Sequence, residues 1–293
     1  MSKSIRVALH QHSCSADVDE NHSTIETGIR QAASQGAQLV LLQELHNSPY
    51  FCQQEDPAVF DLAEPIPGPS SQWLGRLAAE LNVVIVGSLF EKRAAGLFHN
   101  TAVVLDSDGS LAGCYRKMHI PDDPGYYEKF YFTPGDLGFE PINTTLGKLG
   151  VLVCWDQWFP EAARLMALAG AELLLYPTAI GWDPGDDEGE QERQLNAWQT
   201  SQRAHAIHNG LPVLSCNRVG HEPDPAGGPG SEFWGNSFIA GPQGEILAQA
   251  SSEAELLMAE VDLAAVDRTR RIWPFLRDRR IDDYADLLKR YRD

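Results

Sequence analysis

Three reactive side chains stand where predicted strands end. Glu44, Lys117 and Cys154 each follow directly on a strand-like run of residues. Because ligands bind at the carboxyl ends of strands in α/β sheets, we expect the carboxylate, the ammonium and the thiol to lie together. An ionised thiol is a strong nucleophile, a carboxylate can move its proton, and an ammonium can stabilise an oxyanion. The set indicates nucleophilic attack on a carbonyl carbon with loss of a nitrogen leaving group.

Cys154 precedes the predicted helix 161–169. The N-terminus of a helix favours a thiolate, so this position predicts a lowered cysteine pKa, and the backbone N–H of Trp155 is a candidate second donor to the oxyanion. Each residue also has a purely structural interpretation. Cysteine is a common small apolar core residue, and a charge after a strand can simply mark the end of a buried run.

Short apolar runs alternate with amphipathic stretches, which predicts an α/β fold. The runs are continuously rich in Val, Leu and Ile, as in strands buried on both faces. The predicted strands are 5–10, 38–42, 83–90, 149–154, 172–176 and 212–217. The predicted helices are 23–36, 161–169 and 192–209, the first with a Ser23/Glu26 capping box and Gly36 at its end. Hairpins at 100–117 and 236–250 indicate mixed sheets, and no linker divides residues 1–293 into more than one domain.

The overall composition excludes several classes of partner. The formal net charge of −18, from 41 acidic against 23 basic residues, disfavours nucleic-acid binding. Five cysteines without a C-x-x-C pair predict a reducing compartment with no disulfide framework and no zinc site. The N-terminus lacks a signal-peptide pattern and no apolar run reaches membrane-spanning length, so we expect a cytoplasmic protein without a membrane partner. The tail 268–293 carries nine Arg and Lys residues among interleaved acids, and we expect it at an oligomer contact.

The segments around the three reactive residues resemble the Glu-Lys-Cys triad of the nitrilase superfamily. They are Leu41–Leu45, Tyr115–Pro121 and Val153–Ala162. The resemblance implies a four-layer α-β-β-α sandwich with two mixed sheets, no metal or organic cofactor, and homo-oligomers built from dimers. It also implies Cys154 as the nucleophile, Glu44 as the base and Lys117 as the oxyanion stabiliser. Glu128 matches a second glutamate that this superfamily places near the triad, where it could hold Lys117 and bind the substrate nitrogen.

Four further segments resemble the branch of the superfamily that hydrolyses N-carbamoylputrescine, a cationic carbamoyl amine. They are 123–135, 176–181, 236–242 and 275–280. The resemblance implies release of putrescine, carbon dioxide and ammonia through a covalent cysteine intermediate, a step of polyamine biosynthesis from agmatine. Six acids within 183–192 fit a protonated amine, with Asp183 and Asp187 as the candidates. Tyr50, Tyr126 and His119 are further candidates for the pocket.

Other functions fit the same residues. One alternative is hydrolysis of another N-carbamoyl amine, of N-carbamoyl-β-alanine or of an aliphatic amide, and a pocket arginine would favour a substrate that ends in a carboxylate. Another is a binding protein that keeps the fold without catalysis. A third is a thiol redox sensor, in which Cys154 pairs with Cys216.

Overall fold

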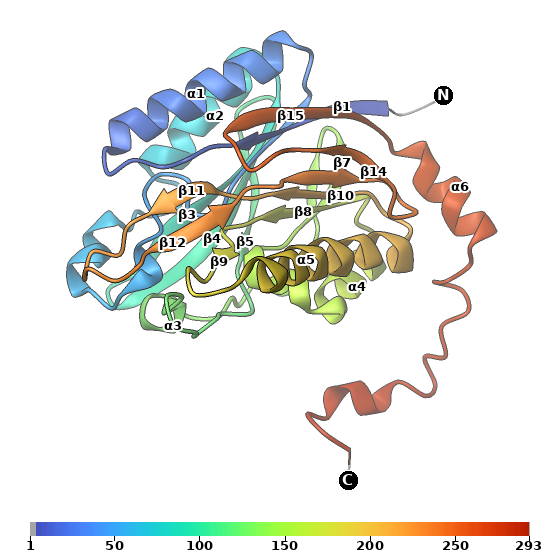
Figure 1. The fold of residues 1–293 in the computed structure, drawn as a ribbon. Helices are drawn as coiled ribbons and strands as arrows, with labels where there is room; N and C mark the ends of the chain where they lie inside the picture. Colours follow the sequence, from blue (N-terminus) through green and yellow to red (C-terminus); the bar gives the residue numbers. More distant parts are fainter. Residues whose placement is uncertain (1–3, 293) are drawn as a thin grey trace.

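Two six-stranded β-sheets lie face to face at the centre of the molecule (Figure 1). The computed structural model describes residues 4–292, so residues 1–3 and 293 of the predicted domain lie outside the described residues. The first sheet has the order β15 (Glu255–Asp262), β1 (Ser4–Gln11), β2 (Leu39–Leu42), β3 (Val84–Ala94), β4 (Leu97–Leu105), β5 (Leu111–Arg116). The second has the order β14 (Ile246–Gln249), β13 (Phe238–Ala240), β10 (Val213–Cys216), β8 (Leu173–Pro177), β7 (Gly147–Val151), β6 (Ile142–Thr144). Both sheets combine parallel and antiparallel pairs, as predicted.

Helices cover the outer face of each sheet and complete four layers. The pair α1 (Val18–Ser34) and α2 (Pro69–Leu81) packs on the first sheet, and the pair α4 (Pro160–Leu168) and α5 (Glu188–Asn209) packs on the second (Figure 1). A small sheet joins β11 (Val219–Glu222), β12 (Ser231–Trp234) and β9 (Gly181–Trp182). The shorter helices are α3 (Glu128–Tyr131), η1 (Phe51–Gln53), η2 (Pro57–Leu62), η3 (Cys154–Trp158) and η4 (Ala285–Leu288). Across residues 4–292, no helix combines the length and the apolarity needed to cross a membrane.

The core explains why the strands read as continuous apolar runs. In β2, Leu39 and Leu41 belong to the core between the two sheets, whereas Val40 and Leu42 belong to the core beneath α1 and α2. Successive side chains of a strand point to opposite faces, so a strand buried on both faces needs apolar residues at every position. The predicted four-layer sandwich is confirmed.

Two helices begin earlier than predicted. Helix α1 is capped by Asp17, whose carboxylate accepts hydrogen bonds from the backbone N–H groups of the first turn, and Ser23 lies inside the helix. Helix α5 is capped in the same way by Asp187, ahead of the predicted start at residue 192. An Asp side chain satisfies N–H groups that a helix leaves free, so it starts the helix wherever it stands before a compatible run. The predicted end of α1 is confirmed by Gly36, which has a φ of 86°.

Both predicted hairpins form, and three further antiparallel pairs of consecutive strands were missed: β3–β4, β6–β7 and β11–β12. The β4–β5 turn contains Gly109 and the β13–β14 turn contains Gly244, each with positive φ. The longest of the missed hairpins joins β3 to β4. It escaped prediction because β3 continues past the apolar stretch to Ala94 as an exposed ribbon.

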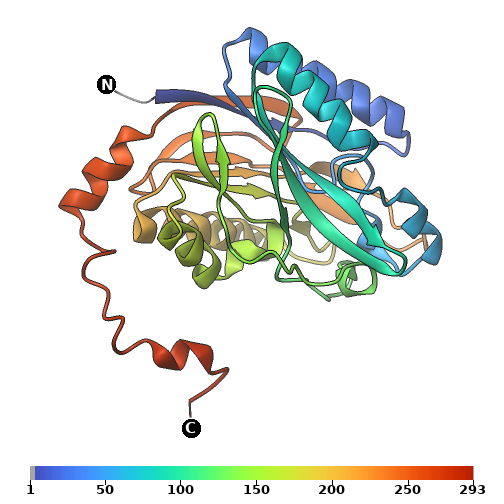
Figure 2. The same cartoon turned by 180° about the vertical axis from the view of Figure 1, so that it is seen from behind.

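The C-terminal tail leaves the layered body. After α6 (Ala264–Ile272), the chain runs outward and away from both sheets (Figures 1 and 2). Ion pairs join Arg280 to Asp282 and Arg292 to Asp286. The tail also exposes large apolar side chains, with Leu288 at 94% exposure. Such a surface is unusual outside an interface.

Candidate active site

Cys154 is presented by a tight turn rather than by the end of a strand. Strand β7 ends at Val151, and Cys154 is the first residue of the 3-10 helix η3, with a φ of 44°. A positive φ is uncommon for a residue with a Cβ, and such conformations cluster at functional sites. The thiol lies 3.7 Å from the carbonyl oxygen of Ala179, which follows β8. The predicted strand 149–154 therefore ends too late, because the observed strand stops at Val151 and Cys154 lies in the turn that follows it.

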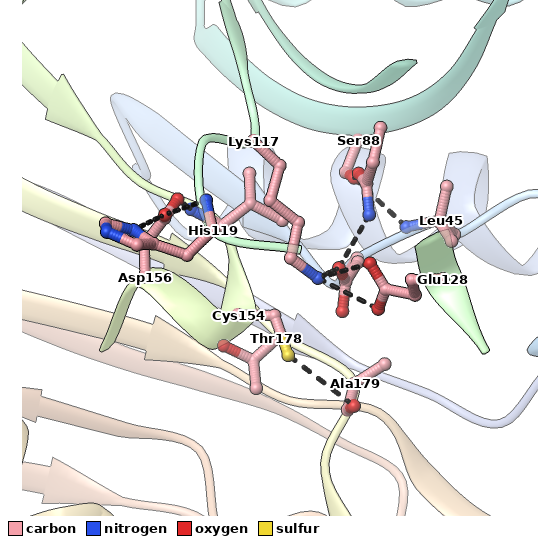
Figure 3. Close-up of polar contacts among 12 residues, drawn as sticks. Leu45, Ser88, Lys117, His119, Glu128, Cys154, Asp156, Thr178 and Ala179 are labelled. Atoms are coloured by element: carbon pink, nitrogen blue, oxygen red, sulfur yellow. Dashed lines mark hydrogen bonds and ion pairs between the residues drawn. The ribbon is translucent and has the colours of Figure 1, made fainter. Parts of the chain in front are cut away.

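Lys117 lies between two glutamates in the buried interior (Figure 3). Its Nζ is 2.7 Å from Oε1 of Glu44, and it is 2.9 and 2.7 Å from the two carboxylate oxygens of Glu128. Cys154 interacts electrostatically with all three groups. The structure thus brings together the four residues that the sequence places in separate segments.

Two further side chains orient the carboxylates. Nδ2 of Asn100 donates to Oε1 of Glu44 at 2.7 Å, and the hydroxyl of Tyr50 donates to Oε1 of Glu128 at 2.8 Å. Oε2 of Glu44 is buried and has no hydrogen-bond partner among the described residues. One oxygen of Glu44 is therefore anchored, and the other is available to accept a proton.

The predicted lowering of the Cys154 pKa is wrong. Burial raises the pKa of this thiol well above its ordinary value, and the carboxylate of Glu44 raises it further, while the ammonium of Lys117 opposes both. Desolvation penalises the charged form of a buried thiol, and one short turn does not offset it. The resting thiol is therefore protonated, and it needs a base to become a nucleophile.

Burial acts on the pKa values of Lys117 and Glu128 as well. Burial by itself would lower the pKa of Lys117, but the carboxylates of Glu128 and Glu44 raise it well above its ordinary value, so the ammonium stays charged. Burial raises the pKa of Glu128 to about 7, against the opposing effect of Lys117. Opposite charges in a buried cluster favour ionisation, whereas desolvation and like charges disfavour it.

A cavity of about 620 Å³ opens onto Cys154. Its walls come from the loop before α3, the turn that carries Cys154, the segment after β8 and the start of α5. The lining residues are Pro121, Asp123, Pro124, Tyr126, Cys154, Trp155, Trp158, Ala179, Ile180, Gly181, Asp183, Asp186, Gln194, Ala197 and Trp234. Three of these residues are acidic and none is basic, so the cavity favours a ligand with positive charge.

The acidic loop contributes differently from the prediction. Asp183 lines the cavity as expected, but Asp187 does not, because its carboxylate caps α5 by accepting from the N–H of Glu190. The cavity gains Asp186, whose Oδ2 accepts from Nε2 of Gln194 at 2.7 Å. It also gains Asp123, which lies far away in the sequence.

Of the predicted aromatic and histidine residues of the pocket, some line the cavity and others lie outside its lining. Tyr126 and Trp155 line the cavity. Tyr50 is buried behind Glu128 and does not line the cavity, although its ring lies 5.5 Å from that of Tyr126. His119 is also absent from the walls, because its Nδ1 lies 2.6 Å from Oδ1 of Asp156 and its ring stacks on Phe159.

Asp156 is a site residue that sequence reasoning missed. It is fully buried and accepts from the Val153 N–H and the Tyr115 hydroxyl, in addition to its bonds with His119. It thereby ties the turn of Cys154 to the segment of Lys117. An acid two residues after the reactive cysteine, inside an apolar segment, was the available signal.

Neither a metal site nor a disulfide accompanies the thiol in the described residues. No group of three potential His, Cys, Asp or Glu ligands occurs between residues 4 and 292. The five cysteines are free, and the Cys216 thiol contacts Ser237 and the backbone of His10. Cys154 faces the charged cluster instead.

The comparisons with known proteins agree with this geometry. A family model described as carbon-nitrogen hydrolase matches residues 6–271. An N-carbamoylputrescine amidase from Solanum lycopersicum is 46% identical, covering 97% of this chain and 95% of the relative. A citrullinase from Francisella tularensis is 41% identical, covering 98% and 99%. The crystal structure of a carbon-nitrogen hydrolase from Helicobacter pylori G27 superposes with a TM-score of 0.96 at 55% identity, covering 99% and 100%. The chain therefore belongs to the carbon-nitrogen hydrolase family of the nitrilase superfamily, and it is a hydrolase that acts on non-peptide C–N bonds.

Proposed function

We propose that this protein hydrolyses N-carbamoylputrescine to putrescine, carbon dioxide and ammonia, a step that forms a polyamine precursor. The observation that carries the proposal is the cavity that opens onto Cys154. Its lining includes the carboxylates of Asp123, Asp183 and Asp186 and no basic side chain. The substrate has a carbamoyl group at one end and a protonated amine at the other. A named amidase for this compound at 46% identity supports the same substrate.

The chemistry follows from the charge state of the cluster. Oε2 of Glu44 takes the proton of the Cys154 thiol, and the sulfur attacks the carbamoyl carbon. The Lys117 ammonium and the Trp155 backbone N–H stabilise the negative oxygen that forms. Glu44 then gives its proton to the leaving nitrogen as the C–N bond breaks. The intermediate is a thiocarbamate, in which the carbamoyl carbon keeps its second nitrogen. Water gives a proton to Glu44 and attacks this carbon, the C–S bond breaks, and the sulfur takes the proton back, so the thiol is restored. The carbamic acid that leaves breaks down to carbon dioxide and the second nitrogen product.

Glu128 has two roles in this proposal. It holds the Lys117 ammonium through both carboxylate oxygens, which aims the cation at the reacting centre. It also offers an acceptor for the N–H groups of the carbamoyl end. The hydroxyl of Tyr50 favours the ionised form of Glu128 by donating to it.

The distal acids decide between substrates. Asp123, Asp183 and Asp186 attract an ammonium and repel a carboxylate, so N-carbamoyl-β-alanine is disfavoured. Citrulline is the second candidate because a named citrullinase is 41% identical. Citrulline carries both an ammonium and a carboxylate, and the lining offers no cation for the latter.

The direct test is turnover of N-carbamoylputrescine, citrulline, N-carbamoyl-β-alanine and a short aliphatic amide, measured as released ammonia and amine. We expect the highest kcat/KM for N-carbamoylputrescine and no turnover by Cys154→Ala. Preference for a carboxylate-bearing substrate would refute the substrate assignment. Activity retained in Cys154→Ala would refute the mechanism, and a wild-type protein inactive on all four compounds would refute the substrate assignment.

The acidic lining has its own test with a matched control. Asp183→Asn and Asp186→Asn remove charge from the cavity, whereas Asp187→Asn removes the same charge from a helix cap. We expect the first two to raise KM for N-carbamoylputrescine about 10-fold each, as the loss of roughly 1.4 kcal/mol implies. Asp187→Asn should leave KM unchanged. Equal effects of all three variants would show that only the general acidity of the loop matters.

We further propose that residues 1–293 act as one hydrolase domain whose tail, 268–293, contacts another subunit in an assembly built from dimers. The apolar side chains exposed on the tail support this proposal. Truncation after residue 267 should lower the number of subunits per particle, obtained by light scattering as the molar mass divided by the mass of one subunit. An unchanged number of subunits would exclude the tail from the interface.

A further inference from the structure

The buried guanidinium of Arg218 forms hydrogen bonds with the loop that carries Glu44. Arg218 follows β10 and is fully buried. Its Nη2 donates to the carbonyl oxygens of Glu44 and Leu45 at 3.0 and 2.9 Å, and its Nη1 donates to that of Ser48 at 2.9 Å. One side chain thus binds three backbone carbonyls of the segment 44–50. None of these contacts involves the reacting atoms.

Glu222 completes the arrangement from the end of β11. Its Oε1 accepts from Nη1 of Arg218 at 2.6 Å, and its Oε2 accepts from the backbone N–H of Tyr50. The pair therefore holds both ends of the loop. One end carries the proposed base Glu44, and the other carries Tyr50, whose hydroxyl reaches Glu128.

The backbone of the loop is strained at Leu45. Leu45 has a φ of 49°, a left-handed conformation that costs free energy for a residue with a Cβ. Its backbone N–H donates to the Ser88 hydroxyl, which in turn donates to Asn100, the residue that anchors Oε1 of Glu44. Hydrogen bonds from a buried charged donor are stronger than neutral ones, so they can hold a strained loop.

We propose that Arg218 and Glu222 are positioning residues that set the orientation of Glu44 and Tyr50 for the hydrolysis, an inference that rests on the proposed function. Arginine is required because its planar fork presents several donors in fixed directions, whereas a lysine ammonium is one point charge. Loss of the fork lets the loop relax and moves the base away from the thiol. A displacement of about 1 Å can cost about 100-fold in rate.

The test compares two buried or partly buried arginines. Arg218→Lys should lower kcat about 100-fold with little change in KM, because the base is misplaced while the cavity walls remain. Arg116→Lys is the matched control, since Arg116 makes a two-pronged ion pair with Glu91 and a bond to Asp136, away from the loop. It should lower the thermal midpoint without a comparable loss of kcat. Equal kcat losses at equal loss of stability would overturn the proposal.

A substrate-independent readout separates this proposal from the substrate assignment. Iodoacetamide alkylates Cys154 when the sulfur forms the C–S bond, iodide leaves and the thiol proton passes to Glu44. Alkylation followed by peptide mass spectrometry should be slower in Arg218→Lys by a factor similar to the kcat loss, and unchanged in Arg116→Lys. This comparison decides the positioning role even if N-carbamoylputrescine is not turned over. Unchanged alkylation in Arg218→Lys would overturn it.

Glu222→Gln serves as a second, milder variant should Arg218→Lys fold poorly. Glutamine can still accept from Arg218, but its NH₂ group would face the backbone N–H of Tyr50. The Tyr50 hydroxyl should then hold Glu128 less well, and the acid limb of the kcat/KM profile should move to higher pH. A profile that matches the wild-type protein would contradict the role of Glu222.

Discussion

Replacing Asp156 with Asn tests how the turn of Cys154 is held. The carboxylate is fully buried and accepts four hydrogen bonds. Oδ2 accepts from the Val153 N–H at 2.9 Å and from the Tyr115 hydroxyl at 2.8 Å. Oδ1 accepts from the backbone N–H of His119 at 3.1 Å and lies 2.6 Å from its Nδ1. All four hydrogen bonds are therefore donated to the one carboxylate of Asp156.

The magnitude follows from counting donors. If the new amide oxygen faces His119, the NH₂ group faces the Val153 N–H, which loses its acceptor, while the Tyr115 hydroxyl can turn and accept. One unsatisfied buried N–H costs about 1–3 kcal/mol. The two bonds kept to His119 lose the charge on their acceptor, at about 1 kcal/mol each. We therefore expect Asp156→Asn to lower the free energy of unfolding by about 3–5 kcal/mol.

Urea unfolding followed by tryptophan fluorescence measures this loss, and ammonia release measures the activity of the folded fraction. Asp106→Asn is the control, because Asp106 also accepts several hydrogen bonds, from Ser107 and Thr145, but lies partly exposed in a hairpin turn. We expect it to cost under about 1 kcal/mol, in the range of surface substitutions. A loss for Asp156→Asn no larger than for the control would refute the donor count.

Three further outcomes are expected. Tyr50→Phe removes a hydrogen bond that lowers the pKa of Glu128. The acid limb of the kcat/KM profile, expected near pH 7 in the wild-type protein, should therefore move to higher pH. An unmoved limb would show that the ionisation of Glu128 does not control the reaction. Lys117→Met leaves two buried carboxylates without their cation and should cost about 3–5 kcal/mol in urea unfolding, together with all turnover; a stable variant would contradict the coupled cluster. Burial lowers the pKa of His46 to about 3, so the unfolded chain takes up a proton first and stability should fall as pH drops below 6.5, by about 1.4 kcal/mol per pH unit from this residue. His46→Gln should flatten that slope in urea titrations at pH 7 and pH 5, and an identical slope would exclude His46.

Much of the fold could be predicted because local patterns carry it. The runs around Leu41 and Leu174 are apolar at successive positions, which is typical of short strands buried on both faces. Helix starts were predicted less well, since Asp17 and Asp187 each offer a cap that competes with later candidates. The place of β15 beside β1 depends on long-range pairing, which no local pattern reveals.

The amino-acid sequence by itself determined the reactive groups and their order along the chain, because Glu44, Lys117 and Cys154 each stand after a strand-like run. Only the tertiary structure decided their charge states. Burial keeps the Cys154 thiol protonated, against the effect expected of a helix start, because desolvation depends on every surrounding atom. The tertiary structure also decided that Asp123 lines the cavity and that Arg218 binds the loop of Glu44. These contacts join segments that are distant in the sequence, so they exist only once the two sheets have packed together.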